Sequence, residues 1–190
     1  MRALPLLIVA IFFVSCARAT TLTGTILAPN LAPDFTLTDA LTERPLALSS
    51  LRGSVVALSF LYTNCPDVCP LTAEHFREAQ KALGPDAARV QFVAVSVDPR
   101  NDTRESVRTF TADHRLTMNW AYLIGPQADL AAVWALYGIG SADNGTASVS
   151  HNDAIFLIDP RGRERVLVHA DTVIDDLVSD LRVLAREGSG

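Results

Sequence analysis

The chain has 190 residues, of which 49% are hydrophobic, and it carries a formal net charge of -5. This length is enough for one well-packed domain and too short for two of ordinary size. The net charge is negative, and no Lys/Arg cluster is interleaved with aromatic residues. The sequence therefore offers no positive electrostatic field to attract phosphates, and we expect no nucleic-acid partner.

Residues 1–19 have the pattern of a targeting leader. The apolar run over residues 4–14 follows a positive charge and is shorter than the roughly 20 apolar residues that span a bilayer. Two processing sites compete after it. Residues 17–19 fit signal-peptidase cleavage, whereas residues 13–16 resemble a bacterial lipobox in which Cys16 becomes the lipidated first residue, although Phe13 stands where leucine is usual.

We expect an exported protein, located in the periplasm or on the outer face of the cytoplasmic membrane. Lipidation of Cys16 would give it an N-terminal membrane anchor, and a plain cleaved leader is the alternative. Residues 20–31 are polar and are expected to form a tether. One domain is expected over residues 32–187.

The domain is expected to alternate strands and helices. Residues 55–61 form a continuous apolar run, which is typical of a strand buried on both faces. Residues 71–83 follow with helical spacing of their apolar side chains, and residues 90–97 form the next strand. A helix starts at about Thr103, with Asp102 and Glu105 in a capping-box pattern.

A short strand with its own helix follows. The strand is expected over residues 120–124, and Pro126 lies in the first turn of the helix, which Gly138 ends. Residues 140–152 are polar and contain glycine, so we expect a loop there.

The chain ends in a hairpin and a helix. Strands over residues 154–158 and 163–168 are joined by a tight turn, and Asp171 or Thr172 caps the last helix. The complete order of elements predicts an α/β, thioredoxin-like fold with an N-terminal extension and an inserted strand-helix element.

Cys65 and Cys69 lie where the first long strand turns into a helix. The positive end of the helix dipole favours the thiolate, which is the form that binds metal and attacks sulfur. Helical residues four apart have Cβ atoms about 5–6 Å apart, whereas a relaxed disulfide needs roughly 3.5–4.5 Å. A disulfide across so short a loop would also add little stability. The spacing therefore favours a shared soft metal ion, with the disulfide as a second accessible state.

Two thiolates leave an open position on a soft metal, for which imidazole is a natural third ligand. His75 faces away round the helix from the second cysteine, and His114 and His169 lie at the ends of elements remote from this turn. His151 instead ends the polar loop just before the strand at residues 154–158. In a thioredoxin fold that loop passes beside the cysteine turn. The predicted metal ligands are Cys65, Cys69 and His151.

Three segments resemble the Sco/SenC family: the motif Cys65-Pro66-Asp67-Val68-Cys69-Pro70, residues 95–103, and His151 with residues 155–160. The resemblance covers roughly residues 33–186. Family members are thioredoxin-like copper proteins that use two cysteines and a histidine to help assemble the dinuclear copper centre of cytochrome c oxidase. One departure is Ser150, because the family often has Asp before the histidine.

The resemblance implies that Cys65, Cys69 and His151 bind a copper ion, as Cu(I) or Cu(II). It also implies a partner, which is the copper-bearing subunit of cytochrome c oxidase or another copper-trafficking protein. Asp98, Pro99 and Asp102 match the family as well, but roles as turn and helix cap account for them, so they are assigned no catalytic role.

The competing interpretation is a thiol-disulfide oxidoreductase that cycles Cys65 and Cys69 without metal. Thioredoxin-type redox motifs separate their cysteines by two residues, and here three residues lie between them, so we do not expect a dedicated enzyme. A peroxidase is disfavoured because Tyr62 and Leu58 stand where peroxiredoxins have Thr and Pro. A copper or redox sensor that uses the same ligands stays open.

Overall fold

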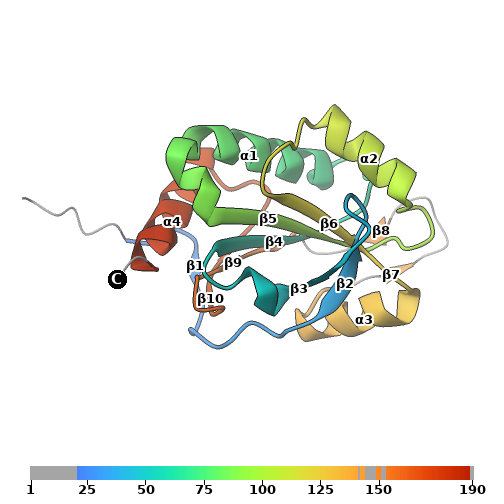
Figure 1. The fold of residues 1–190 in the computed structure, drawn as a ribbon, viewed down its shortest axis with the longest axis horizontal. Helices are drawn as coiled ribbons and strands as arrows, with labels where there is room; N and C mark the ends of the chain where they lie inside the picture. The colour runs from blue at the N-terminus through green and yellow to red at the C-terminus, as the bar shows by residue number, and fades with distance from the viewer. Residues whose placement is uncertain (1–20, 141, 144–148, 151–152, 189–190) are drawn as a thin grey trace, which may run out of the picture.

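The computed structural model describes residues 21–140, 142–143, 149–150 and 153–188, and its centre is a mixed eight-stranded sheet (Figure 1). The order across the sheet is β1-β10-β9-β4-β5-β6-β2-β3. Its strands are β1 (Thr25–Ile26), β2 (Thr36–Asp39), β3 (Pro45–Ala47), β4 (Val55–Leu61), β5 (Val90–Ser96), β6 (Trp120–Ile124), β9 (Ile155–Ile158) and β10 (Glu164–Val168). The helices are α1 (Val68–Leu83), α2 (Arg104–Asp113), α3 (Gln127–Leu136) and α4 (Ile174–Glu187), with short 3-10 helices at Leu48–Leu51 and Gly84–Arg89.

The centre of the sheet is parallel and its flanks are antiparallel. β4 pairs in parallel with β5, and β5 with β6, whereas β9 joins the other side of β4 in the antiparallel sense. Every residue of β4 is buried, as a strand covered on both faces requires. Because β4 and β5 are parallel and in register from Val55 opposite Val90 to Leu61 opposite Ser96, their C-terminal ends meet at one edge.

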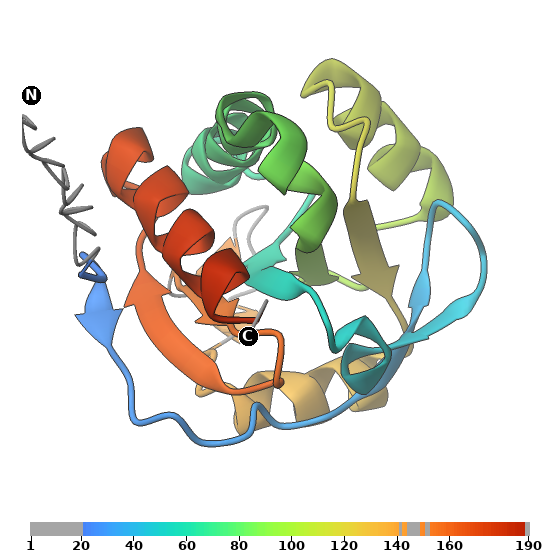
Figure 2. The ribbon, with the colours of Figure 1, turned by 60° about the vertical axis from the view of Figure 1, so that its left-hand side comes forward.

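Helices α1, α2 and α4 cover one face of the sheet, and α3 covers the other (Figures 1 and 2). On the first face, Phe76 of α1 packs against Phe92 of β5, with ring centroids 5.0 Å apart. On the second face, Tyr137 packs against Phe60 of β4 at 5.5 Å. Among the described residues, no helix has both the length and the apolar character that crossing a membrane requires.

Several element boundaries differ from those expected. α1 begins at Val68, three residues earlier than predicted, so that Cys69 lies in its first turn. The polar segment predicted as a loop contains a small two-stranded ladder, in which β7 (Ala142–Asp143) pairs with β8 (Val149–Ser150). The last helix is preceded by Val173, not capped by Asp171 or Thr172.

The capping box of α2 was assigned to the wrong residues. Thr103 is the N-cap, and its hydroxyl accepts a hydrogen bond from the backbone N–H of Ser106 at 3.1 Å. The Ser106 hydroxyl in turn accepts from the backbone N–H of Thr103 at 2.9 Å. Asp102, predicted as the cap, directs its carboxylate elsewhere, which is why the adjacent threonine takes over the helix end.

The segment expected to act as a tether contributes strand β1 to the sheet. Thr25 and Ile26 pair with β10. Just before them, the backbone N–H groups of Thr23 and Gly24 donate to the two carboxylate oxygens of Asp180 in α4, at 2.7 and 3.1 Å. Asp180 is fully buried, so this segment is attached to the helix as well as to the sheet.

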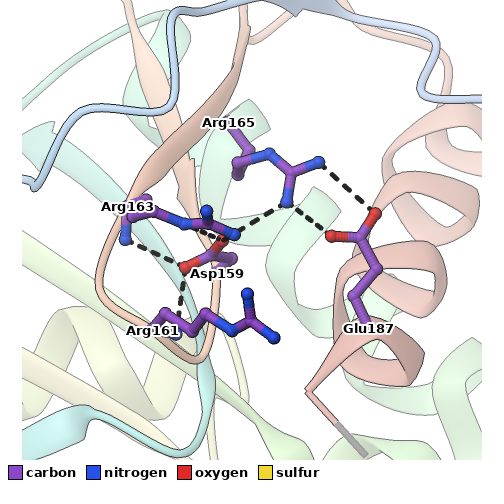
Figure 3. Close-up of polar contacts among 5 residues, drawn as sticks. All are labelled: Asp159, Arg161, Arg163, Arg165 and Glu187. Carbon is purple, nitrogen blue, oxygen red and sulfur yellow. Dashed lines mark hydrogen bonds and ion pairs between the residues drawn. The ribbon is translucent and has the colours of Figure 1, made fainter. Parts of the chain in front are cut away.

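A second buried carboxylate joins the β9–β10 turn to the end of α4 (Figure 3). Asp159 accepts hydrogen bonds from the backbone N–H groups of Arg161 and Arg163 and from the guanidinium groups of Arg163 and Arg165. Arg165 also contacts Glu187 of α4 at 2.5 Å. Because the oxygens of Asp159 are all engaged by these donors, we interpret the cluster as a structural brace.

Candidate metal centre

The two cysteines lie side by side at the C-terminal end of β4. Cys65 occupies the turn after the strand, where its backbone N–H donates to the carbonyl of Tyr62 at 3.3 Å. Cys69 is the second residue of α1. Cys65 is 8% exposed and Cys69 is fully buried, and no disulfide joins their sulfurs. The structure therefore brings these two predicted ligands together, and their role in metal binding stays a prediction.

The sulfur of Cys65 accepts a hydrogen bond from the backbone N–H of Cys69, with an N to Sγ distance of 3.3 Å. First-turn amides of a helix have no partner within the helix. Asp67, at the N-cap, makes no side-chain capping bond, and Pro70 has no N–H to offer. The Cys65 sulfur therefore acts as the acceptor at the start of α1, where the helix dipole favours a negative charge.

This arrangement makes the two thiols chemically unequal. The hydrogen bond from the Cys69 thiol lowers the pKa of Cys65 to about 5, against the opposing effect of burial, and backbone N–H groups add to the lowering. The pKa of Cys69 is raised, first by its hydrogen bond to Cys65 and then by burial. At neutral pH, Cys65 is therefore the thiolate and Cys69 is the thiol that donates to it.

The third predicted ligand, His151, lies outside the described residues. What the structure does place is the strand that follows it: β9 pairs with β4, and Ile155 stands opposite Ser59, two residues before the end of β4. The chain after His151 thus enters the sheet next to the strand that leads to Cys65. Within the described part of the chain, no three His, Cys, Asp or Glu residues gather into a metal-binding group.

The other three histidines have separate surroundings. His75 is in α1 and partly buried. His114 follows α2 and packs on the ring of Phe110, with centroids 4.4 Å apart. His169 contacts Asp153 through Nδ1 at 2.8 Å. None of the three joins the cysteine pair in a metal-binding group among the described residues.

A buried carboxylate beneath the cysteine turn was missed as a feature of the site. Asp102 is 4% exposed. Its Oδ1 accepts from both the backbone N–H and the hydroxyl of Thr63, each at 2.8 Å. Its Oδ2 accepts from the hydroxyls of Ser96 at 2.6 Å and Tyr122 at 2.9 Å. Burial raises the pKa of Asp102, and the hydrogen bonds from Ser96, Thr63 and Tyr122 oppose that rise.

One signal in the sequence indicated that Asp102 lies near the cysteine turn. Asp102 follows β5, the strand next to the one that carries the cysteines, and loops after neighbouring parallel strands meet at the same edge of the sheet. The capping-box pattern gave a local explanation for Asp102 as a helix cap, and this explanation hid its contact with the distant cysteine turn.

Comparisons with known proteins agree with this fold. The sequence model of a family described as SCO1/SenC matches residues 23–186. A SCO1 protein homolog of Bacillus subtilis is 30% identical over 143 residues, which are 72% of this chain and 74% of that protein.

Two solved structures are also similar. Bradyrhizobium japonicum ScoI with copper bound has a TM-score of 0.71 and 27% identity, over 81% of this chain and 99% of that one. BsSco is described as a member of the Sco family of cytochrome c oxidase assembly proteins in which a disulfide switch was identified. It has a TM-score of 0.71 and 27% identity, over 85% of this chain and 98% of that one. These likenesses confirm the predicted thioredoxin-like fold.

Proposed function

Because this chain belongs to the SCO1/SenC family, we propose that it binds one copper ion and delivers copper to, or prepares, the dinuclear copper centre of cytochrome c oxidase. The observation that carries the proposal is the pair of adjacent buried sulfurs, of which Cys65 is a thiolate at neutral pH. The similarity to a copper-bound ScoI and to a family of oxidase assembly proteins supports the same function.

The donor set fits a soft ion. Thiolates favour Cu(I), whereas hard cations prefer carboxylate and carbonyl oxygens. In this proposal Cys65, Cys69 and His151 hold the copper, with imidazole as the third donor. Cys65 is already deprotonated, while the raised pKa of Cys69 means that its proton must leave when the metal binds. We therefore expect copper binding to release close to one proton at neutral pH.

A copper titration tests the proposal. The reduced full-length protein is titrated anaerobically with Cu(I) against a competing chelator, and the metal is counted per protein. We expect one copper per chain in the wild type and none in a Cys65→Ser, Cys69→Ser double variant. Copper bound by the double variant at full stoichiometry and affinity would contradict the proposal, as would a wild type that binds none.

The inequality of the two sulfurs also favours a second function, that of a thiol-disulfide oxidoreductase. Cys65 is the less deeply buried of the two cysteines, and its lowered pKa suits attack on a disulfide. The fully buried thiol of Cys69 suits resolution of the mixed disulfide. The disulfide switch of BsSco supports this alternative. Disulfide reductase turnover by the metal-free protein, measured beside copper affinity, separates the two functions.

The proposal includes a location and a partner. The leader within residues 1–19 is cleaved so that a lipidated Cys16 becomes the first residue and anchors the protein at the outer face of the cytoplasmic membrane. The folded domain carries the copper site. The partner is the copper-bearing subunit of cytochrome c oxidase or another copper-trafficking protein. Fractionation of the native host, followed by crosslinking of the membrane fraction, tests both parts.

A further inference from the structure

We propose that Asp102 is the positioning residue of the Cys65–Cys69 site, and that its carboxylate sets the affinity of the pair for copper and its reduction potential. The part of the inference that concerns copper affinity rests on the proposed copper function. The part that concerns the reduction potential does not depend on it. Asp102 acts through Thr63, two residues before Cys65, because it accepts hydrogen bonds from both the backbone N–H and the hydroxyl of Thr63.

The carboxylate links three strands at the edge where the cysteines lie. Thr63 follows β4, Ser96 ends β5, and Tyr122 is in the middle of β6. All three donate to Asp102, and no oxygen of the carboxylate is left with fewer than two donors. The chain leaving β4 is thus fixed relative to the neighbouring strands before it enters the cysteine turn.

Part of the cysteine turn is exposed to solvent. Asn64, Pro66 and Asp67 are exposed, and Asp67 makes no capping bond. Within the turn, the backbone N–H of Cys65 reaches the carbonyl of Tyr62. The two bonds from Thr63 to one charged acceptor attach the first half of the turn to the neighbouring strands, and bonds to charged groups are about twice as strong as neutral ones.

An isosteric change shows what the charge contributes. All four groups around Asp102 are donors, and a backbone N–H cannot reverse its role, so Asp102→Asn must keep its carbonyl oxygen toward Thr63 and turn its amide toward Ser96 and Tyr122. Those two hydroxyls can rotate to accept. The variant keeps the shape of the network and loses the charge that holds Thr63.

Loosening this attachment is expected to change both copper affinity and the reduction potential of the cysteine pair. Copper binding weakens, because the two sulfurs are no longer held where one ion meets both. The reduced pair also becomes easier to oxidise, because the N–H of Cys69 donates to the Cys65 sulfur less often and the turn is freer to close the disulfide. In a glutathione buffer, the pair loses two electrons to one oxidised glutathione, whose disulfide breaks to give two reduced glutathione molecules that take up any protons released by the pair.

The test compares two buried carboxylates. Asp102→Asn and Asp180→Asn are made in the full-length protein, since Asp180 is also fully buried and accepts two backbone N–H groups, but lies in α4 beside Thr23 and Gly24. Melting temperature, Cu(I) affinity by chelator competition and reduction potential in glutathione buffers are measured for both. We expect Asp102→Asn to weaken copper binding at least tenfold, and to shift the potential at least tenfold in the equilibrium constant, about 30 mV more negative.

Asp180→Asn should lower the melting temperature and leave both other quantities at their wild-type values. Wild-type affinity and potential in Asp102→Asn would overturn the inference, and so would equal shifts in the two variants, which would show a general effect of lost stability. If the wild type binds no copper, the proposed function fails, and the potential still decides the role of Asp102.

A milder variant covers the case in which Asp102→Asn does not fold. Thr63→Val has nearly the same shape, keeps the backbone bond to Asp102 and removes only the hydroxyl bond. We expect shifts of the same sign and about threefold in size. A Thr63→Val protein with wild-type potential would likewise overturn the inference.

Discussion

The backbone N–H of Cys69 donates a hydrogen bond to the sulfur of Cys65 across 3.3 Å. This bond and the one from the Cys69 thiol hold the pKa of Cys65 at about 5. We expect iodoacetamide to react with Cys65 of the reduced, metal-free protein at a rate that is half-maximal near pH 5, with Cys69 unreactive. A Cys65→Ser variant should leave only slow reaction at alkaline pH. Equal midpoints near pH 8.5 for both thiols would contradict the assignment.

Changing His151 to alanine should remove copper affinity without unfolding the domain. The two thiols meet without the imidazole, so we expect the pair to oxidise normally, whereas the copper loses its third donor. The free energy of unfolding of the metal-free protein should change by at most about 1 kcal/mol, because removing a polar side chain leaves no apolar cavity. His114→Ala, which removes a histidine at the end of α2, is the matched control. Unchanged affinity in His151→Ala would send the search for a third ligand elsewhere.

Asp159→Asn should destabilise the protein and leave copper binding intact. Removing the charge leaves Arg163 and Arg165 without their buried partner, and breaking a buried pair costs about 3 kcal/mol. Glu187→Gln, at the exposed end of the same brace, should cost at most about 1 kcal/mol. Urea unfolding of the metal-free variants measures both. A loss for Asp159→Asn no larger than for Glu187→Gln would show that burial of this pair contributes nothing.

The same brace gives a pH dependence with a definite sign. The pKa of Asp159 is lowered because the hydrogen bonds and charges of Arg163 and Arg165 outweigh its burial. A lowered pKa in the folded state means that its stabilisation is fully present above the ordinary carboxyl pKa and is lost as pH falls below that value. We expect wild-type stability to fall more steeply than that of Asp159→Asn as the pH drops below about 4. Parallel curves would contradict this.

The mature N-terminus decides how the protein is held at the membrane. If Cys16 is lipidated, mass spectrometry of the protein from its native host should find Cys16 as the first residue, carrying several acyl chains, because one chain alone binds a bilayer only marginally. Cys16→Ser should then release the protein from the membrane fraction. An unmodified terminus at Thr20 would exclude the anchor.

The parts of this structure that were predictable from sequence are those fixed by local patterns. β4 and β6 begin and end where expected, because each is an apolar run with turn residues at its ends, which leaves little choice for its first and last residues. The adjacency of Cys65 and Cys69 follows from a spacing of four residues at a helix start. The fold class followed from the order of elements alone.

The parts that were missed depend on contacts between distant residues. Asp102 and Thr63 are 39 positions apart, and nothing near either one announces the bond. Asp180 is 157 positions from Thr23, so residues 20–31 looked like a tether although β1 is part of the sheet. Local propensity also misplaced the cap of α2, since Asp and Thr are both good N-caps and only the tertiary demand on Asp102 selects Thr103.

The attachment of Thr23 and Gly24 to α4 also governs how the domain behaves toward its own copies. β1 is the outermost strand beside β10, and β3 is outermost at the other side, with two and three residues respectively. Long open strand edges recruit strands from other molecules, and short ones do not. Gly24 lets the segment lie close, since a Cβ there would stand 2.5 Å from Val166. We therefore expect the pairing of β1 with β10 to limit edge-to-edge association, so that removing the residues before Leu27 should leave more of β10 open to strands of other molecules.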